Sequence, residues 1–229
     1  TPLNYWFNAG YGAMFFAAGI AGIVYAKQVG LSSIIGKALS FIGSGLLSYG
    51  VAQFIWLYYN LFSSIEVPYP SVADLFFLLF YVLVFIGFMS LLNIFKQSIT
   101  KAKVIQSIIL LPIVLAVSLV FVFKPDLSSD VSLLGKALNF AYPVCDTLVL
   151  YIILITLRVS GGYFKSTTWF FSAAGVVLLL GDFLFTYRNS QDIYWNGDIS
   201  DLVFLISAYL FFISFVYFKQ KIVEVSSVL

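Results

Sequence analysis

The feature that most constrains this chain is a series of seven apolar stretches, each about 17–25 residues long, joined by short polar connectors. They cover residues 5–26, 38–62, 72–95, 104–123, 134–157, 168–187 and 202–218. A helix of about 20 apolar residues crosses a bilayer, whereas a membrane barrel would show alternating segments of about 10 residues. Only 10% of the residues are charged, against about 25% in soluble proteins. We therefore predict an all-α integral membrane protein, with one domain of seven transmembrane helices across residues 1–229.

The connectors alternate in the sign of their charge. One set, together with the carboxyl-terminal tail, is rich in basic residues: Lys27, Lys37, Lys96, Lys101, Lys103, Arg158, Lys165, Lys219 and Lys221. The other set is rich in acids: Glu66, Asp74, Asp126, Asp130, Asp192, Asp198 and Asp201. Basic connectors of multi-pass proteins stay in the cytoplasm. We therefore predict a multi-pass protein of the cell membrane with its amino terminus outside and its carboxyl terminus in the cytoplasm.

Several classes of cofactor and partner are excluded by what the sequence lacks. It contains no histidine, which removes imidazole-ligated haem and the ordinary zinc sites. A retinal pigment needs a lysine in the middle of its last helix, and residues 202–218 contain none. The net charge of +2 is small and scattered, whereas nucleic-acid binding needs a basic stripe. We expect no cofactor, no metal site and no nucleic-acid partner.

Two aspartates, Asp146 and Asp182, lie within the apolar stretches. At 1.5 Å per helical residue, Asp146 is roughly 15 Å and Asp182 about 9 Å below the outer surface. An aspartate at the centre of a transmembrane helix costs about 2.5–3.5 kcal/mol and is by default a sign of function. Asn8, Tyr49 and Gln53 lie at a similar depth. This distribution predicts a polar, acidic cavity that opens to the outside.

Two further acids, Asp74 and Asp201, have a competing structural interpretation. Each is the last residue of a four-residue pattern typical of a helix capping box, Ser71-Val72-Ala73-Asp74 or Asp198-Ile199-Ser200-Asp201. Either acid could cap a helix and still line the mouth of the cavity. Asp182 could instead form a structural pair with a donor on a neighbouring helix, and Arg188 is the only arginine on that side. The candidate ligand-binding residues are Asn8, Tyr49, Gln53, Asp74, Asp146, Asp182, Arg188 and Asp201.

Four short motifs occur in order from the third apolar stretch to the seventh. They are Pro68-Tyr69-Pro70-Ser71-Val72-Ala73-Asp74-Leu75-Phe76-Phe77-Leu78-Leu79-Phe80-Tyr81, Ala141-Tyr142-Pro143-Val144-Cys145-Asp146, Leu180-Gly181-Asp182-Phe183-Leu184-Phe185 and Asp201-Leu202-Val203-Phe204. This series resembles the seven-helix membrane sensor modules at the amino terminus of prokaryotic diguanylate cyclases and histidine kinases. The resemblance implies a sensor module in which Asp74, Asp146, Asp182 and Asp201 match recurrent acidic positions. This chain departs from that pattern because no output domain follows Lys221, so it either acts alone or is a fragment.

Three functions remain open from the sequence. The first is a sensory or ligand-binding module, which takes an unknown small molecule or lipid on the outer side and couples to a cytoplasmic signalling domain or partner. The second is a small ion- or proton-coupled transporter that uses Asp146 and Asp182. The third is an intramembrane lipid hydrolase with the same two aspartates as an acid–base pair. Two acids without a nucleophile or metal ligand are weak evidence for catalysis, so we favour a non-enzymatic module.

Overall fold

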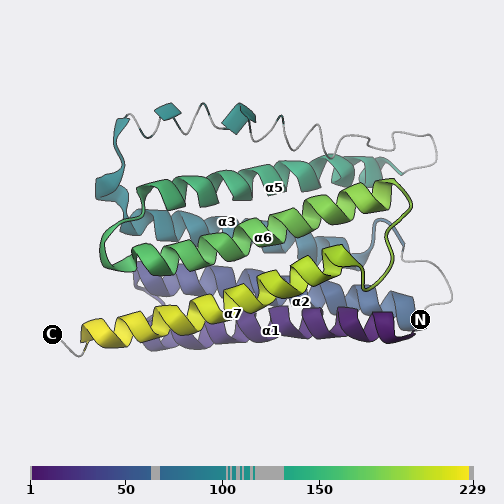
Figure 1. The fold of residues 1–229 in the computed structure, drawn as a ribbon, viewed down its shortest axis with the longest axis horizontal. Coiled ribbons are helices and arrows are strands. Elements are labelled where there is room, and N and C mark those ends of the chain that lie inside the picture. The colour runs from purple at the N-terminus through teal and green to yellow at the C-terminus, as the bar shows by residue number, and fades with distance from the viewer. Residues whose placement is uncertain are drawn as a thin grey trace.

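The computed structural model describes residues 2–62, 68–101, 103, 105, 106, 109, 111–113, 116 and 132–226. Its long elements are all helices (Figure 1): α1 (Pro2–Val29), α2 (Ile34–Phe62), α3 (Val72–Ile94), α5 (Leu133–Val159), α6 (Lys165–Ser190) and α7 (Ile199–Ser226). Two short 3₁₀ turns accompany them, η1 (Lys96–Ser98) and η2 (Gly162–Phe164). These described residues contain no strand. The predicted all-α class is therefore confirmed for this part of the chain.

All 6 long helices have the length and hydropathy needed to cross a membrane. They coincide with six of the seven predicted stretches, while most of residues 104–123 lies outside the described part. The outer face of α3 carries an exposed apolar stripe of the kind that faces lipid. Its residues repeat at helical spacing and are exposed by 66, 43, 54 and 36%: Leu75, Leu79, Val82 and Ile86. The chain is a multi-pass membrane protein.

The six helices form a closed ring in the order α1, α2, α3, α5, α6, α7, with α7 packed again on α1. At one end, Asn8 near the start of α1 bonds Asn196 just before α7 at 2.7 Å. At the same end, Tyr69 before α3 bonds Asn139 near the start of α5 at 2.7 Å. Helices α1, α3, α5 and α7 therefore all begin there and run parallel (Figure 1).

The parallel arrangement of α3 and α5 constrains the chain between them. Helix α3 ends at one end of the bundle and α5 begins at the other, so residues 95–132 connect the two ends. A seventh span over 104–123 would provide this connection, and it stays a prediction.

Charged residues separate between the two ends of the bundle. The end at which α1, α3, α5 and α7 begin, here called the acidic end, carries Asp74, Asp192, Asp198 and Asp201, with Lys136 and Arg188. The opposite, basic end carries the predicted basic set, from Lys27 to Lys221, together with Glu224. Glu66, Asp126 and Asp130 lie outside the described residues. That the basic end faces the cytoplasm stays a prediction.

Glycines allow α1 and α2 to approach closely. A Cβ atom added to Gly19 would lie 2.6 Å from the Leu47 nitrogen and 2.7 Å from the Gly43 oxygen, both in the backbone of α2. One turn further along, a Cβ atom on Gly22 would lie 2.8 Å from the Gly43 Cα. Small residues promote helix association in lipid because they let backbones touch. This contact fixes one side of the ring.

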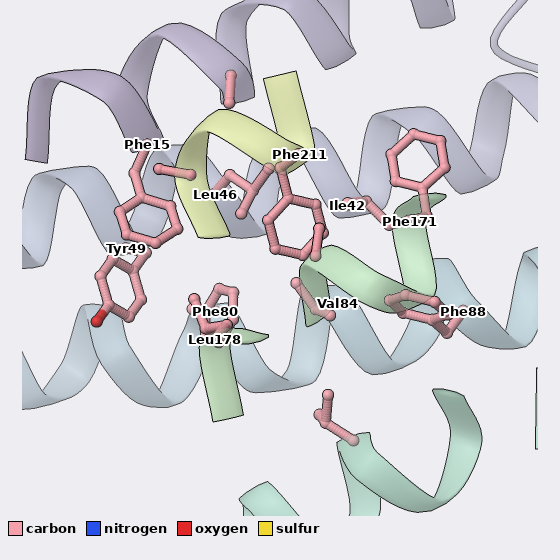
Figure 2. Close-up of a cluster of buried hydrophobic side chains, with 14 of the residues drawn as sticks. Phe15, Ile42, Leu46, Tyr49, Phe80, Val84, Phe88, Phe171, Leu178 and Phe211 are labelled. Atoms are coloured by element: carbon pink, nitrogen blue, oxygen red, sulfur yellow. The ribbon is translucent and has the colours of Figure 1, made fainter. Parts of the chain in front are cut away.

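The interior of the ring is filled by large apolar side chains (Figure 2). They come from all six long helices and include Phe15, Ile42, Leu46, Tyr49, Phe80, Val84, Phe88, Phe171, Leu178 and Phe211. All are buried, and only Tyr49 among them carries a polar atom, its hydroxyl. Buried polar and acidic side chains lie between this core and the acidic end.

Candidate functional site

Asp146 and Asp182 meet at one tyrosine in the interior of the bundle. The Tyr81 hydroxyl of α3 donates to Asp182 Oδ2 of α6 at 3.4 Å. Asp146 of α5 interacts with the same hydroxyl. The side chain of Asp146 is buried, with its residue only 4% exposed, whereas Asp182 is partly exposed. The two aspartates singled out in the sequence therefore lie together, on different helices, around Tyr81; we call these three residues the Tyr81 cluster.

The Tyr81 cluster has no basic partner within the described part of the chain. The ion pairs found there are Arg188 with Asp198 and Lys221 with Glu224. The donor that Asp182 finds on a neighbouring helix is therefore Tyr81, whereas Arg188, the arginine considered for that role, does not pair with it. Six residues along a helix turn the side chain by roughly 240°, so Arg188 points away from the face that carries Asp182. Arg188 instead bonds Asp198 and the Ile193 carbonyl, the latter at 3.2 Å.

Asp74 both caps α3 and contacts α5. Its Oδ2 accepts from the Ser71 nitrogen at 2.6 Å, while the Ser71 hydroxyl accepts from the Ala73 nitrogen at 3.2 Å. The predicted capping box is therefore confirmed. The second carboxylate oxygen, Oδ1, accepts from the Tyr142 hydroxyl of α5 at 2.6 Å. Because the Tyr142 ring packs edge-on against Tyr81 at 6.2 Å, Asp74 is joined to the Tyr81 cluster.

Tyr69 adds a second connection between the start of α3 and α5. Its hydroxyl donates to Asn139 Oδ1 at 2.7 Å. Partial burial, reinforced by the negative charge of Asp74, raises the pKa of Tyr69 to about 12. The hydroxyl therefore stays protonated and able to donate at any physiological pH.

Replacing Tyr142 with phenylalanine tests this contact between α3 and α5. The change removes only the hydroxyl that donates to Asp74, so we expect the free energy of unfolding to fall by about 1.5–3 kcal/mol, the usual contribution of a hydrogen bond to a charged group. Chemical denaturation in detergent micelles measures the loss. Tyr209→Phe is the control, since Tyr209 is 55% exposed on the outside of α7. Equal stability of the two variants would contradict the contact.

Asp201 differs in detail from the capping box predicted for it. Asp198 does act as the cap, because its Oδ1 accepts from the Ser200 nitrogen at 2.7 Å. The Asp198 nitrogen, however, already bonds the Trp195 carbonyl at 3.1 Å. The Asp201 carboxylate therefore accepts from the Gly197 nitrogen at 2.6 Å. Gly197 has φ +90°, a left-handed conformation that favours glycine.

The remaining predicted residues gather around Asp201. The Tyr194 hydroxyl lies 3.4 Å from both Asp201 oxygens, and burial and Asp201 together raise the pKa of Tyr194 well above its usual value. Asn8 reaches this group through its bond to Asn196. Gln53 of α2 accepts from the Tyr11 hydroxyl at 2.8 Å. We call the set the Asp201 cluster: Asn8, Tyr11, Gln53, Tyr194, Asn196 and Asp201.

Tyr49 lies between the two clusters. Its ring contacts Phe204 of α7 at 6.0 Å and Phe80 of α3 at 5.2 Å. Its hydroxyl faces Gln53 on one side and the Asp182 carboxyl on the other. The two clusters therefore form a nearly continuous polar band across the ring of helices.

Sequence reasoning missed the tyrosines that hold this band together. Tyr81 and Tyr142 stand in two of the four motifs but were given no role of their own, while Tyr11 lies in an apolar stretch and Tyr194 in a connector. A buried tyrosine usually finds a partner for its hydroxyl. A tyrosine inside a transmembrane stretch, one or two turns from an acid, is therefore the sequence feature that could have identified these residues.

A cavity open to the outside at the polar band stays a prediction. Two surface hollows on the described residues lie at the basic end. One is lined by Gly162, Lys165, Ser166, Trp169 and Phe170, and the other by Tyr25, Val216, Lys219, Gln220, Val223 and Glu224. What the band does offer is two buried acceptors without a hydrogen-bond donor, Asp146 Oδ1 and Asn8 Oδ1.

Comparison of the chain with protein-family models, with curated proteins and with solved structures found no match.

Proposed function

We propose that the chain is a membrane-embedded sensory or ligand-binding module. Its polar band takes a ligand from the acidic end, and the change reaches the basic end, where a cytoplasmic partner or output domain reads it. The observation that carries this proposal is the band itself: acids and hydroxyls from separate helices meet in the interior, and Asp146 Oδ1 lacks a donor there. A buried polar group without a partner is costly, so a ligand that supplies one would be bound favourably.

Helices α6 and α7 provide a rigid route from the band to the basic end. A Cβ atom on Gly181, next to Asp182, would lie 2.7 Å from the Phe204 ring, so the two helices touch there. Further along, the Ser207 hydroxyl donates to the Ala174 carbonyl at 2.9 Å. The rings of Phe171 and Phe215 lie 4.9 Å apart. Packed elements of this kind shift as units rather than deform.

The interior of the basic half favours sensing over transport. Phe88, Phe171 and Phe215 are fully buried there. The hydroxyls of Thr156 and Ser214 donate to carbonyls of their own helices, at 2.7 and 2.6 Å. The Ser172 hydroxyl is the one buried hydroxyl of the described residues without a hydrogen-bond partner, and a single free group does not make a line along which an ion would pass from the band to the basic end. No specific contact favours the paired-aspartate hydrolase, since the Tyr81 cluster contains no nucleophile.

Spin-label distances at the basic end test the proposed coupling. Labels are placed at residues 31 and 223, which are 50% and 58% exposed, in a chain whose Cys145 is replaced by alanine. Asp201→Asn removes the charge that Gly197 and Tyr194 contact. We expect the distance between the labels in lipid nanodiscs to shift by about 1–2 Å, the size of helix movements in switching proteins.

The matched control is Leu75→Ala, which changes a lipid-facing side chain that is 66% exposed near the start of α3. It should leave the distance distribution unchanged. If folded Asp201→Asn protein also gives the parent distribution, coupling between the two ends is refuted.

A further inference from the structure

The Tyr81 cluster holds two carboxyl groups and no cationic side chain. The groups that face it are Tyr49 from α2, Tyr81 from α3, Tyr142 and Cys145 from α5, and no lysine or arginine among the described residues. The one arginine on the acidic end is paired with Asp198. Buried carboxyl groups are stable when they are paired, coordinate a metal or take up a proton. A positive charge from outside the chain would neutralise the cluster without protonating it.

An oxygen atom inside the cluster is free to receive that charge. Asp146 is only 4% exposed. Its Oδ1 atom is buried and has no hydrogen-bond partner. The Thr147 hydroxyl beside it already donates to the Pro143 carbonyl at 2.7 Å. Both lone pairs of Asp146 Oδ1 therefore remain available in the interior of the bundle.

The oxygens of the cluster suit a monovalent metal ion. Hard cations prefer carboxylate and other oxygen ligands. The described residues contain no group of three or more acidic or thiol ligands that could hold a metal together, and divalent ions usually bind such groups. Two carboxylates and a phenol instead match the charge and the ligand type of a singly charged ion that keeps part of its water shell.

We propose that Asp146, Asp182 and Tyr81 bind one monovalent metal cation, Na⁺ or K⁺, which enters from the acidic end. Asp182 is the entrance ligand because it is partly exposed, whereas Asp146 is the inner ligand. The Tyr81 oxygen is the third ligand, since its hydroxyl already lies 3.4 Å from Asp182. This inference rests on the proposed ligand-binding role of the polar band and names its ligand.

Thermal unfolding of the full chain in nanodiscs tests the proposal. NaCl or KCl replaces choline chloride at constant ionic strength and pH, so that only a small cation is added. Because a ligand that binds the folded state alone raises the unfolding midpoint, we expect a rise of about 5–10 °C at roughly 100-fold excess over the dissociation constant. The salt with the larger effect identifies the preferred ion.

Three variants and one control connect the effect to the cluster. Asp146→Asn and Asp182→Asn should abolish the rise. Tyr81→Phe keeps both carboxylates and replaces the asparagine variants as the test if either of them fails to fold. In this variant the ion concentration needed to raise the unfolding midpoint should be about tenfold higher. Asp192→Asn removes an exposed acid of the same end and should respond as the parent does. No rise with either salt, or a full rise in Tyr81→Phe and the asparagine variants, would overturn the proposal.

The same preparation separates this inference from the proposed function. If the ions raise the midpoint but the labels at residues 31 and 223 stay at one distance in Na⁺, in K⁺ and in choline, the cation site stands and signalling fails. If Asp201→Asn moves the labels while neither ion raises the midpoint, the signalling role stands and the cation site fails.

Discussion

Replacing Gly19 with leucine is expected to lower the free energy of unfolding by about 3 kcal/mol or more. Even the first added carbon would lie 2.6 Å from the Leu47 nitrogen and 2.7 Å from the Gly43 oxygen. These are backbone atoms of α2, which cannot rotate aside as a side chain can, so α1 and α2 must separate. Tyr11 on α1 and Gln53 on α2 would then lose their 2.8 Å bond.

Gly10 provides a matched control within the same helix. A Cβ atom added there meets nothing within 4 Å, so Gly10→Leu should be neutral or slightly stabilising, since leucine favours helix more than glycine does. Both variants are compared by chemical denaturation in the same micelles. Equal unfolding curves for the two leucine variants would show that the close contact between α1 and α2 is not needed.

Replacing Arg188 with methionine should cause a loss of about 3–5 kcal/mol. The change leaves the Asp198 carboxylate, whose side chain is 1% exposed, without its basic partner. Removing one member of a buried ion pair is strongly destabilising because the other charge remains buried. The Ile193 carbonyl, which Arg188 contacts at 3.2 Å, also loses a donor. The free energy of unfolding is again the quantity measured.

The double variant Arg188→Met with Asp198→Asn should recover part of that loss, because the buried charge is then gone. Lys136→Met removes the other basic residue of the acidic end among the described residues, and it should change stability little, since Lys136 is in no ion pair there. If Arg188→Met is as stable as Lys136→Met, the pair with Asp198 contributes nothing to the fold.

The helices were predictable because the membrane imposes a simple rule on length and hydropathy. Residues 72–95 were predicted as a span, and α3 occupies Val72–Ile94. The cap at Asp74 was predictable as well, since the pattern Ser71 to Asp74 satisfies neighbouring backbone groups and needs no distant partner. Both signals are local, so the sequence contains them in full.

Contacts between helices could not be predicted in the same way. The sequence placed Arg188 near Asp182, yet the helix turns the two side chains to different faces and Arg188 meets Asp198 instead. Asp146 and Asp182 were both recognised as unusual, but Tyr81, which joins them, lies in an uninterrupted apolar stretch. A hydrogen bond across the bundle leaves no spacing in the sequence that identifies its two ends.

The shared direction of four helices has an electrical consequence. Helices α1, α3, α5 and α7 begin at the acidic end, and α2 and α6 are the described helices that finish there. Each helix start carries roughly half a positive charge from its aligned peptide dipoles, and each helix finish roughly half a negative one. The described backbone therefore contributes an excess of about one positive charge at the end where Asp74, Asp198 and Asp201 lie. A transmembrane voltage would therefore act on a smaller difference in charge between the two ends of the bundle than the side chains alone would give.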